Sequence, residues 1–361
     1  VFAQLDQLMP LPVSVVPAKG KFRITDKFAV SIRQKEPTRV DEGAKRFLQR
    51  LDGRTALNIP DYADKIAFPV DGLNIVVNRK GKLQLHEDES YKLQVTAARI
   101  MLDAETDIGA LRGLETVLQL LSVDEQGYYL PGCKIEDAPR FPWRGLLIDV
   151  CRHWQPVEVI HRNLDAMAAM KLNVFHWHLS EDQGFRIESK KFPMLHQLGS
   201  NGDYFTQEQV REIIAYADAR GIRVVPEFDI PGHATAWFVG HPELASAPGP
   251  YTIEKKFGVF EPAMNPANEA TYKFLEVFLA EMTALFPDAY FHIGGDENEG
   301  KQWDKNPEVA QLKKDKGLQE NHDVQAYFNQ RLLEMLTENG KRMVGWDEIL
   351  QPSIPTNIVI Q

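Results

Sequence analysis

The sequence of 361 residues has little cysteine, no long hydrophobic run and no long basic run. Its two cysteines, Cys133 and Cys151, are too few for a disulfide framework or a thiolate metal cage. The gap between them leads from a loop into a core strand, so we expect two free thiols. No apolar segment approaches the roughly 20 residues that a membrane span needs. The net charge of -10 argues against a nucleic-acid partner.

The composition is that of an ordinary globular protein, with 43% hydrophobic and 25% charged residues. The length suffices for two domains, one of which could be a barrel. The acidic balance is compatible with a neutral, sugar-like substrate and would repel a polyanion. Residues 1–3 end in a small side chain, as signal-peptide cleavage sites do, so we expect export to the periplasm or the medium.

Residues 1–138 are expected to form a small α+β domain. Short segments rich in β-branched residues, or alternating polar with apolar ones, predict strands at 28–32, 73–77 and 91–95. Apolar residues at helical spacing predict helices at 41–51 and 109–121. The segment holds no cluster of chemistry-bearing residues, which favours a supporting, non-catalytic role.

Two prolines in residues 137–143 interrupt any regular element, so the second domain is predicted to cover residues 139–361. Strands and helices then alternate, a pattern typical of a parallel sheet with crossover helices. The expected strands cover residues 145–150, 172–177, 222–227, 290–293, 342–346 and 357–360. The expected helices cover residues 156–170, 207–220, 269–286 and 324–340.

This alternation favours a (β/α)8 (TIM) barrel of the α/β class. A complete barrel needs eight strands and about six are visible, so we expect the barrel to be C-terminally incomplete in this chain. A polypeptide that ended there is expected to be unstable and to have little activity, because strand edges would be unpaired.

The segment 289–300 is the strongest candidate for catalysis. A short apolar strand meets Gly294 and Gly295 and then places Asp296 beside Glu297. Glycines allow unusual backbone angles or the close approach of a ligand. Adjacent carboxylates repel each other's charged forms, which favours one protonated partner, the form that a general acid needs. Such acids are also common as helix caps or solvated turn residues.

Similar side chains follow the other predicted strands, and barrel enzymes place catalytic residues at these ends. They are Asp149 with Arg152 and His153, then His176 to Asp182, Glu227 to His233, and Trp346 with Asp347 and Glu348. Tryptophan suits the apolar face of a sugar ring, and carboxylates bind its hydroxyls. The loop at 240–264 is a candidate wall of the site. Taken singly, the histidines and Trp346 could be core residues, and Asp229 could simply stabilise a turn.

The second domain resembles the family 20 glycoside hydrolases, the β-N-acetylhexosaminidases, from about Pro139 to its end. The residues that carry the resemblance occur in the family's order, and the His-x-Gly-Gly-Asp-Glu element at 292–297 is highly specific. The others are Arg144-Gly145, Asp149, Arg152-His153, the segments 176–185 and 226–233, and Trp346-Asp347-Glu348. The first domain resembles, more loosely, the α+β domain that precedes the barrel in that family.

The resemblance implies retaining, exo-acting hydrolysis of terminal β-linked N-acetylglucosamine or N-acetylgalactosamine by substrate assistance. The substrate's 2-acetamido carbonyl would attack the anomeric carbon and form an oxazolinium intermediate. Glu297 would act as general acid and then as general base. Asp296 would hold the acetamido group and stabilise the charge on its nitrogen. No metal or organic cofactor is implied.

The resemblance also implies supporting residues. Arg144 would grip the 3- and 4-hydroxyls of the sugar, and Trp346 would wall the acetamido pocket. His233 would pair with an acid after the second strand, which leaves Glu181 and Asp182 as alternatives. Further pocket residues of the family would lie beyond Gln361.

Two other hypotheses stay open from the sequence. His176 and His178 lie on one side of a strand, as in some metal-dependent barrel hydrolases. That reading explains neither the glycine pair nor the tryptophans. A non-catalytic carbohydrate-binding fragment is the third reading, and the intact Asp296 and Glu297 speak against it. The preferred partner is a glycoconjugate with a terminal β-linked N-acetylhexosamine. The sequence predicts no oligomeric state.

Overall fold

The computed structural model describes residues 5–62, 68–352 and 354–361. The export hint at residues 1–3 therefore lies outside the described residues and stays a prediction. None of the described helices combines the length and the apolar character that crossing a membrane requires.

The chain forms two compact units. The first consists of the described parts of Val1–Gly145 with His161–Val174 and Ala215–Arg223. The second consists of Leu146–Ile160, Phe175–Ile214 and the described parts of Val224–Gln361.

The first unit is built on a seven-stranded sheet. Its strands are β1 (Ser14–Arg23), β2 (Val30–Arg33), β3 (Leu73–Arg79), β4 (Tyr91–Val95), β5 (Ile100–Thr106), β6 (Ser122–Asp124) and β7 (Gly127–Asp137). The order is β1-β7-β4-β5-β3-β2, and β6 pairs with β7. β3 runs parallel to β2 and β5, whereas β4 and β7 are paired antiparallel.

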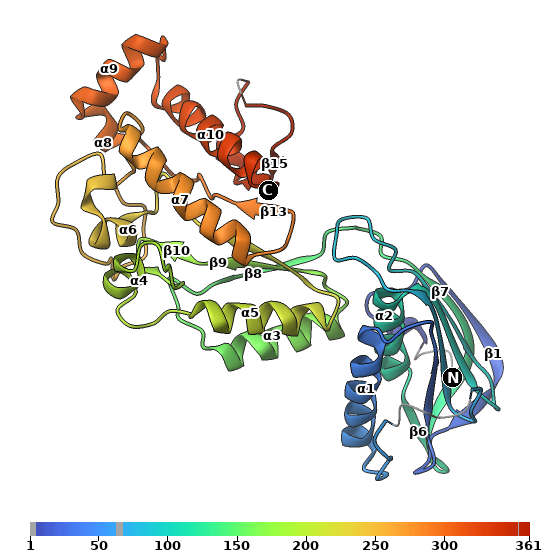
Figure 1. Ribbon diagram of the computed structural model, residues 1–361. Coiled ribbons are helices and arrows are strands. Elements are labelled where there is room, and N and C mark those ends of the chain that lie inside the picture. The colour runs from blue at the N-terminus through green and yellow to red at the C-terminus, as the bar shows by residue number, and fades with distance from the viewer. Residues whose placement is uncertain (1–4, 63–67, 353) are drawn as a thin grey trace. The chain divides into compact units, whose positions relative to one another are not determined.

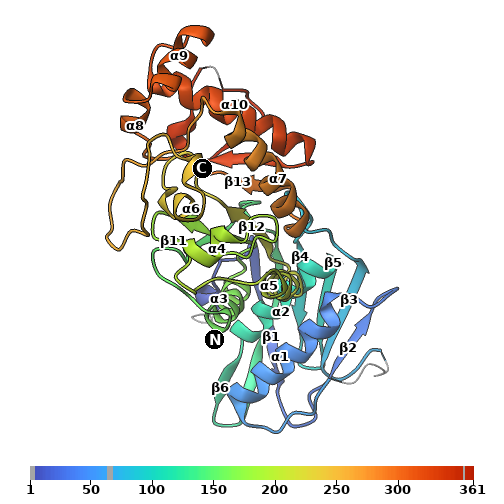
Figure 2. The same ribbon diagram turned by 60° about the vertical axis from the view of Figure 1, so that its left-hand side comes forward.

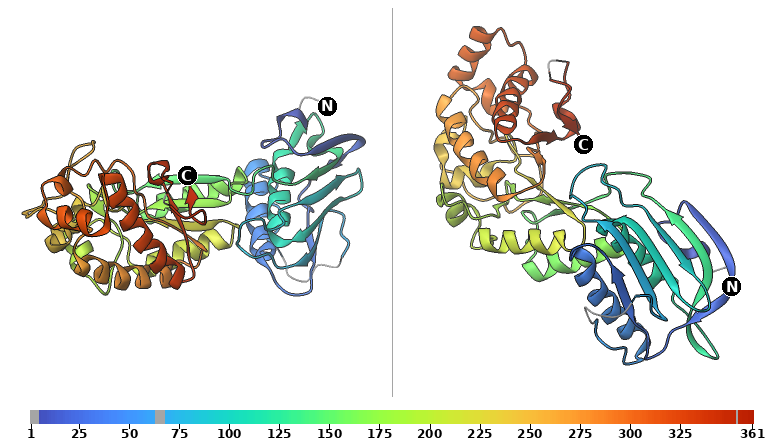
Figure 3. Two further views of the ribbon diagram at one scale, coloured as in Figure 1. Left: turned by 90° about the horizontal axis from the view of Figure 1, so that it is seen from above. Right: turned by 45° about the vertical axis from the view of Figure 1, so that its right-hand side comes forward.

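Two helices cover one face of this sheet, α1 (Arg39–Thr55) and α2 (Asp107–Gln119) (Figures 1 and 3). Burial alternates along β4 and β5, as expected for a sheet with one wet face. Thr38 and Thr106 cap the two helices, and each side-chain oxygen accepts from a backbone N–H of the first turn. The core lies between the helices and the sheet.

The second sheet has six strands in the order β15-β14-β13-β12-β9-β8. They are β8 (Gly145–Asp149), β9 (Val174–His178), β12 (Arg223–Glu227), β13 (Tyr290–His292), β14 (Arg342–Gly345) and β15 (Val359–Ile360). The recorded registers of β12 with β13, β13 with β14 and β14 with β15 are parallel. Every residue of β9, β12 and β13 is buried, as in a parallel sheet covered on both faces.

Helices connect these strands, and α7 and α10 lie side by side near β13 (Figures 1 and 2). The bounds are α3 (Val157–Ala169), α4 (Met194–Gly199), α5 (Gln207–Asp218), α6 (Thr235–Gly240), α7 (Glu269–Leu285), α8 (Lys301–Asp304), α9 (Pro307–Lys316) and α10 (Asn321–Glu338). Short elements complete the chain: β10 (Ser180–Glu181), β11 (Gly184–Phe185), η1 (Leu5–Gln7), η2 (Pro242–Leu244) and η3 (Asp347–Ile349).

The structure confirms all six predicted strands of the second domain, its four predicted helices and the two free thiols. The sequence analysis missed β1, β5, β6 and β7. β1 and β7 contain proline and glycine, which disfavour a strand prediction, and their register breaks between Pro17 and Lys21. In β1 and β7 the pairing with neighbouring strands outweighs the low strand propensity of proline and glycine.

Leu102→Ala is expected to destabilise the protein by about 2–5 kcal/mol, because Leu102 is fully buried between the sheet and α2. The free energy of unfolding in urea measures this loss. Val123→Ala is the matched control, since Val123 is 67% exposed and should change stability by less than about 0.5 kcal/mol. Equal losses for the two variants would contradict the assigned core.

Candidate active site

Four neighbouring strands of the second sheet end in polar side chains. The last residues of β8, β9, β12 and β13 are Asp149, His178, Glu227 and His292. The carboxyl ends of parallel strands meet at one edge of a sheet, so the loops that follow these residues converge there. The acids singled out in the sequence lie in these loops.

A tight turn after β13 carries Asp296 and Glu297. Gly294 has φ 70°, Gly295 φ 92° and Glu297 φ 50°, all in the left-handed region. A Cβ atom on Gly294 would lie 1.9 Å from Oδ1 of Asp229, and the backbone N–H of Gly295 donates to that same oxygen at 3.0 Å. Asp229 therefore shapes the turn, and only glycine fits at position 294.

His233 lies between two pairs of carboxylates. Its Nδ1 is 2.9 Å from Oε1 of Glu181 and 3.2 Å from Oδ2 of Asp182. Its Nε2 is 3.3 Å from Oε2 of Glu297 and 3.8 Å from Oδ2 of Asp296. The structure thus brings five of the predicted site residues together, and both acids after β9 contact the histidine.

The charge of His233 follows from these contacts. Burial by itself would lower its pKa, but the carboxylates of Asp182 and Glu181 outweigh burial and raise it to about 11. The imidazole is therefore a cation at neutral pH. Its φ of 49° is rare for a residue other than glycine, so the backbone at His233 is strained. The contacts of its ring with the surrounding carboxylates help to maintain this conformation.

Asp296 and Glu297 differ in environment although they are adjacent. The side chain of Glu297 is 47% exposed and that of Asp296 is 21% exposed. Oδ1 of Asp296 is buried and has no hydrogen-bond partner. An acceptor of this kind can take an N–H from a bound molecule, whereas the more exposed Glu297 can exchange protons with water.

The surroundings of Asp229 favour its protonated form. Burial is the main cause that raises its pKa well above the usual range, and the negative charge of Asp296 adds to it. Its Oδ1 accepts from Gly295, and the protonated form can donate a hydrogen bond to the neighbouring carboxylate of Asp296. In the sequence this residue stood among the polar residues after the third strand and within the family segment 226–233, with simple turn chemistry as the alternative.

Trp346 belongs to a second buried group, centred on Glu227. The indole Nε1 donates to Oε1 of Glu227 at 2.9 Å, and His176 and His178 place ring nitrogens 2.6 and 2.8 Å from Oε2. Burial opposes ionisation of Glu227, but the charge of His178 and the contacts with the histidines outweigh it and hold the pKa of Glu227 well below its usual range. A charged Glu227 thus orients Trp346, and nothing in the sequence pattern had singled it out for this.

Arg144 belongs to the first unit, and its recorded contacts are with residues of that unit. Within the first unit its guanidinium donates to Glu89 at 2.6 Å and to the backbone oxygens of Lys171 and Phe141 at 2.8 Å. Each of its three nitrogens already donates to one of these partners, and this does not support the predicted grip on sugar hydroxyls. The motif's other arginine, Arg152, lies just beyond β8, where its guanidinium binds Asp149 at 3.0 Å and also pairs with Glu181.

The predicted loop wall also reaches these residues. The backbone N–H of Glu254 donates to the carbonyl of Asp182 at 3.1 Å, and the side chain of Gln183 donates to the carbonyl of Lys256 at 2.8 Å. The ring of Phe257, which is 89% exposed, lies 5.6 Å from the guanidinium of Arg152.

Gly294→Ala is expected to destabilise the protein more than Gly317→Ala. Both glycines have φ 70°, but a Cβ on Gly317 would meet nothing within 4 Å. The control should cost about 1 kcal/mol for the left-handed backbone, and Gly294→Ala about 1–3 kcal/mol more for the clash with Asp229. Urea unfolding measures both, and equal losses would show that Asp229 does not constrain the turn.

Asp229→Asn is expected to gain stability relative to the wild type as pH rises. In the unfolded chain Asp229 ionises above a pKa of about 4, whereas in the folded protein its raised pKa keeps the proton bound. Wild-type stability therefore falls as pH rises above that value, and the asparagine variant lacks this loss. The difference in unfolding free energy should move in favour of the variant between about pH 4 and pH 7. A difference independent of pH would show that Asp229 is ionised in the fold.

Comparison with known proteins adds an independent observation. Residues 141–361 match the model of glycosyl hydrolase family 20, catalytic domain, and residues 6–138 match that of glycosyl hydrolase family 20, domain 2. A beta-hexosaminidase of Porphyromonas gingivalis is 34% identical over 98% of this chain and 47% of its own length. The human beta-hexosaminidase subunit beta is 40% identical over 73% of this chain and 48% of its own length.

The structure of a chitobiase from Flavobacterium johnsoniae superimposes with a TM-score of 0.95 at 48% identity, over 98% of this chain and 54% of that one. The chain thus spans about half the length of these three relatives. The matches confirm the predicted fold class, a (β/α)8 barrel preceded by a small α+β domain. The chain belongs to glycosyl hydrolase family 20.

Proposed function

We propose that the protein containing this chain is an exo-acting, retaining β-N-acetylhexosaminidase that removes terminal N-acetylglucosamine or N-acetylgalactosamine. The observation that carries the proposal is the pair Asp296 and Glu297, two adjacent acids of unequal exposure that share the cationic His233. The names of the relatives support the same activity.

The mechanism uses the substrate's own acetamido group. Its carbonyl oxygen attacks the anomeric carbon while the glycosidic bond breaks, and Glu297 gives its proton to the leaving oxygen. Water then attacks the anomeric carbon of the oxazolinium, which reopens the acetamido group, and Glu297 takes a proton from this water. Two displacements at one carbon retain its configuration.

Asp296 holds the acetamido group during this reaction. Its buried, unpartnered Oδ1 accepts the acetamido N–H and stabilises the positive charge that develops on the nitrogen. His233, close to both acids, stabilises the carboxylate that Glu297 becomes after proton transfer. Trp346, oriented by Glu227, offers its ring to the acetamido methyl.

Arg152 takes the role that the sequence had suggested for Arg144. Its side chain is 29% exposed at the end of β8, and its pairing with Glu181 fixes the guanidinium beside the acids that contact His233. Arginine donors and carboxylate acceptors are suited to the hydroxyls of a terminal sugar. The preferred partner is therefore a glycoconjugate with a terminal β-linked N-acetylhexosamine.

The metal-dependent alternative is not favoured. One ring nitrogen of each of His176 and His178 lies at hydrogen-bond distance from Glu227, whose other oxygen accepts from Trp346, so these contacts have a structural role without a metal. The family match assigns the chain to glycosidases, whose chemistry the acids after β13 can supply.

Glu297→Gln is expected to lower kcat on p-nitrophenyl N-acetyl-β-glucosaminide by at least about 100-fold, because it removes the general acid and base. The assay uses the complete product of the gene, which contains residues 1–361, and the chain alone in parallel. Glu299→Gln is the matched control, since Glu299 lies in the same loop and its side chain is 59% exposed and has Lys301 as its recorded ion-pair partner.

Two further arms separate the alternatives. Substrate assistance requires the acetamido group, so p-nitrophenyl β-glucoside should not be cleaved at a measurable rate. Treatment with EDTA should leave activity unchanged, and a loss would favour the metal hydrolase. An inactive wild type that still binds N-acetylglucosamine would favour the carbohydrate-binding reading.

A further inference from the structure

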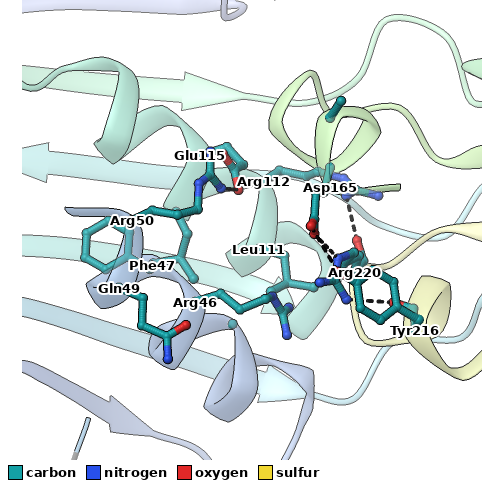
Figure 4. A pocket seen from close by; sticks show the side chains of 14 residues that line it. Arg46, Phe47, Gln49, Arg50, Leu111, Arg112, Glu115, Asp165, Tyr216 and Arg220 are labelled. Carbon is teal, nitrogen blue, oxygen red and sulfur yellow. Dashed lines mark hydrogen bonds and ion pairs between the residues drawn. The ribbon is translucent and has the colours of Figure 1, made fainter. Parts of the chain in front are cut away.

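A second group of charged side chains lines a cavity of about 500 Å³ in the first unit. Residues of α1, α2, α3 and α5 contribute to it, together with Arg220 just after α5 (Figure 4). The catalytic proposal uses none of them. A cavity of this volume falls within the range of small-molecule sites.

Positive charge predominates in the lining. Four arginines face two carboxylates, Glu115 and Asp165, so the lining has a formal excess of two positive charges. The arginines are Arg46, Arg50, Arg112 and Arg220. The chain as a whole has a net charge of -10, so a positive cavity runs against its general balance.

Three of these arginines have carboxylate partners. Arg50 binds Glu115 at 2.5 Å, Arg220 binds Asp165 at 2.7 Å, and Arg112 binds a carboxylate outside the lining, Glu89, at 2.7 Å. In Figure 4 Asp165 points to Arg220 and Glu115 to Arg50. These pairs use up both carboxylates of the lining.

Arg46 differs from the other three. Its Nη2 donates to the backbone oxygen of Ala219 at 2.7 Å, and none of the ion pairs recorded among the described residues includes it. Burial lowers the pKa of Arg46, and the positive charge of Arg220 lowers it further. The more distant charges of Asp165 and Glu42 offset this only in part. A bound anion would relieve the repulsion between the two guanidinium groups.

We propose that this cavity binds a small molecule through an oxyanion, a phosphate, sulfate or carboxylate group held between Arg46 and Arg220. The planar guanidinium fork matches the geometry of such oxygens. The proposal does not depend on the hydrolase activity and assigns a binding function to the first unit.

The walls around the arginines are held in place by packing. The ring of Tyr216 stacks on His161 with 3.9 Å between centroids, and the guanidinium of Arg220 lies 3.4 Å from the centre of the Tyr216 ring. Leu111 and Phe47 provide apolar surface beside Arg46. A fixed cation beside rigid walls loses little conformational freedom on binding.

The test is calorimetric titration of the complete protein with sodium sulfate and sodium phosphate, in chloride buffer of constant ionic strength. Wild type should bind each anion saturably, and Arg46→Gln should weaken binding at least tenfold. Arg46→Lys should give an intermediate affinity, because it keeps the charge and loses the fork. Arg99→Gln is the control: it removes the same charge from an exposed turn of the same unit and should change affinity less than twofold.

Thermal unfolding gives a second readout that a structural role would not produce. Without anion Arg46→Gln should melt no lower than wild type, because it removes a repelled charge. Sulfate stabilises folded proteins in general, so it should raise both midpoints, but that of the wild type by more. Titration with glucose 6-phosphate and with glucose then separates a sugar-borne oxyanion from a free one. Absence of saturable binding to wild type, or equal affinity of wild type and Arg46→Gln, would overturn the proposal.

Discussion

A buried cation, His233, holds the candidate active site together. Its two ring nitrogens face acids from different loops, Glu181 and Asp182 after β9 and Asp296 and Glu297 after β13. Without the imidazolium the buried acids Glu181 and Asp182 would lose the positive charge that faces them, and buried charges that lose their partner are costly. The left-handed backbone of His233 is tolerated because these contacts determine where its ring must lie.

Two further acids, at the end of β12 and just after it, have pKa values shifted in opposite directions. Burial opposes ionisation of Glu227, but its histidine neighbours outweigh burial and hold its pKa well below the usual range, whereas burial against other carboxylates raises the pKa of Asp229 well above it. Glu227 orients Trp346, and Asp229 supports the turn at Gly294 and Gly295. Glu227 and Asp229 are two residues apart in the sequence, but they contact different parts of the site.

The prediction of the fold from sequence succeeded where burial and local pattern agree. β9, β12 and β13 are short apolar segments that lie fully buried, and the helices between them show helical spacing. It failed for β1 and β7, where proline and glycine weaken the local signal and antiparallel pairing over a long stretch supplies the stability. Contacts between distant segments decide such strands.

In the candidate site, too, some features follow from the sequence and others only from the tertiary structure. The adjacency of Asp296 and Glu297 and the two glycines before them are properties of the sequence, because neighbours along a chain stay neighbours in any fold. The sequence indicated only Arg144 for the sugar hydroxyls, and the contacts of Arg144 and Arg152 become visible only in the tertiary structure, because the direction of a long guanidinium side chain depends on acids elsewhere. Glu89, 55 positions away, holds Arg144 within the first unit, while Glu181, 29 positions away, pairs with Arg152 beside His233.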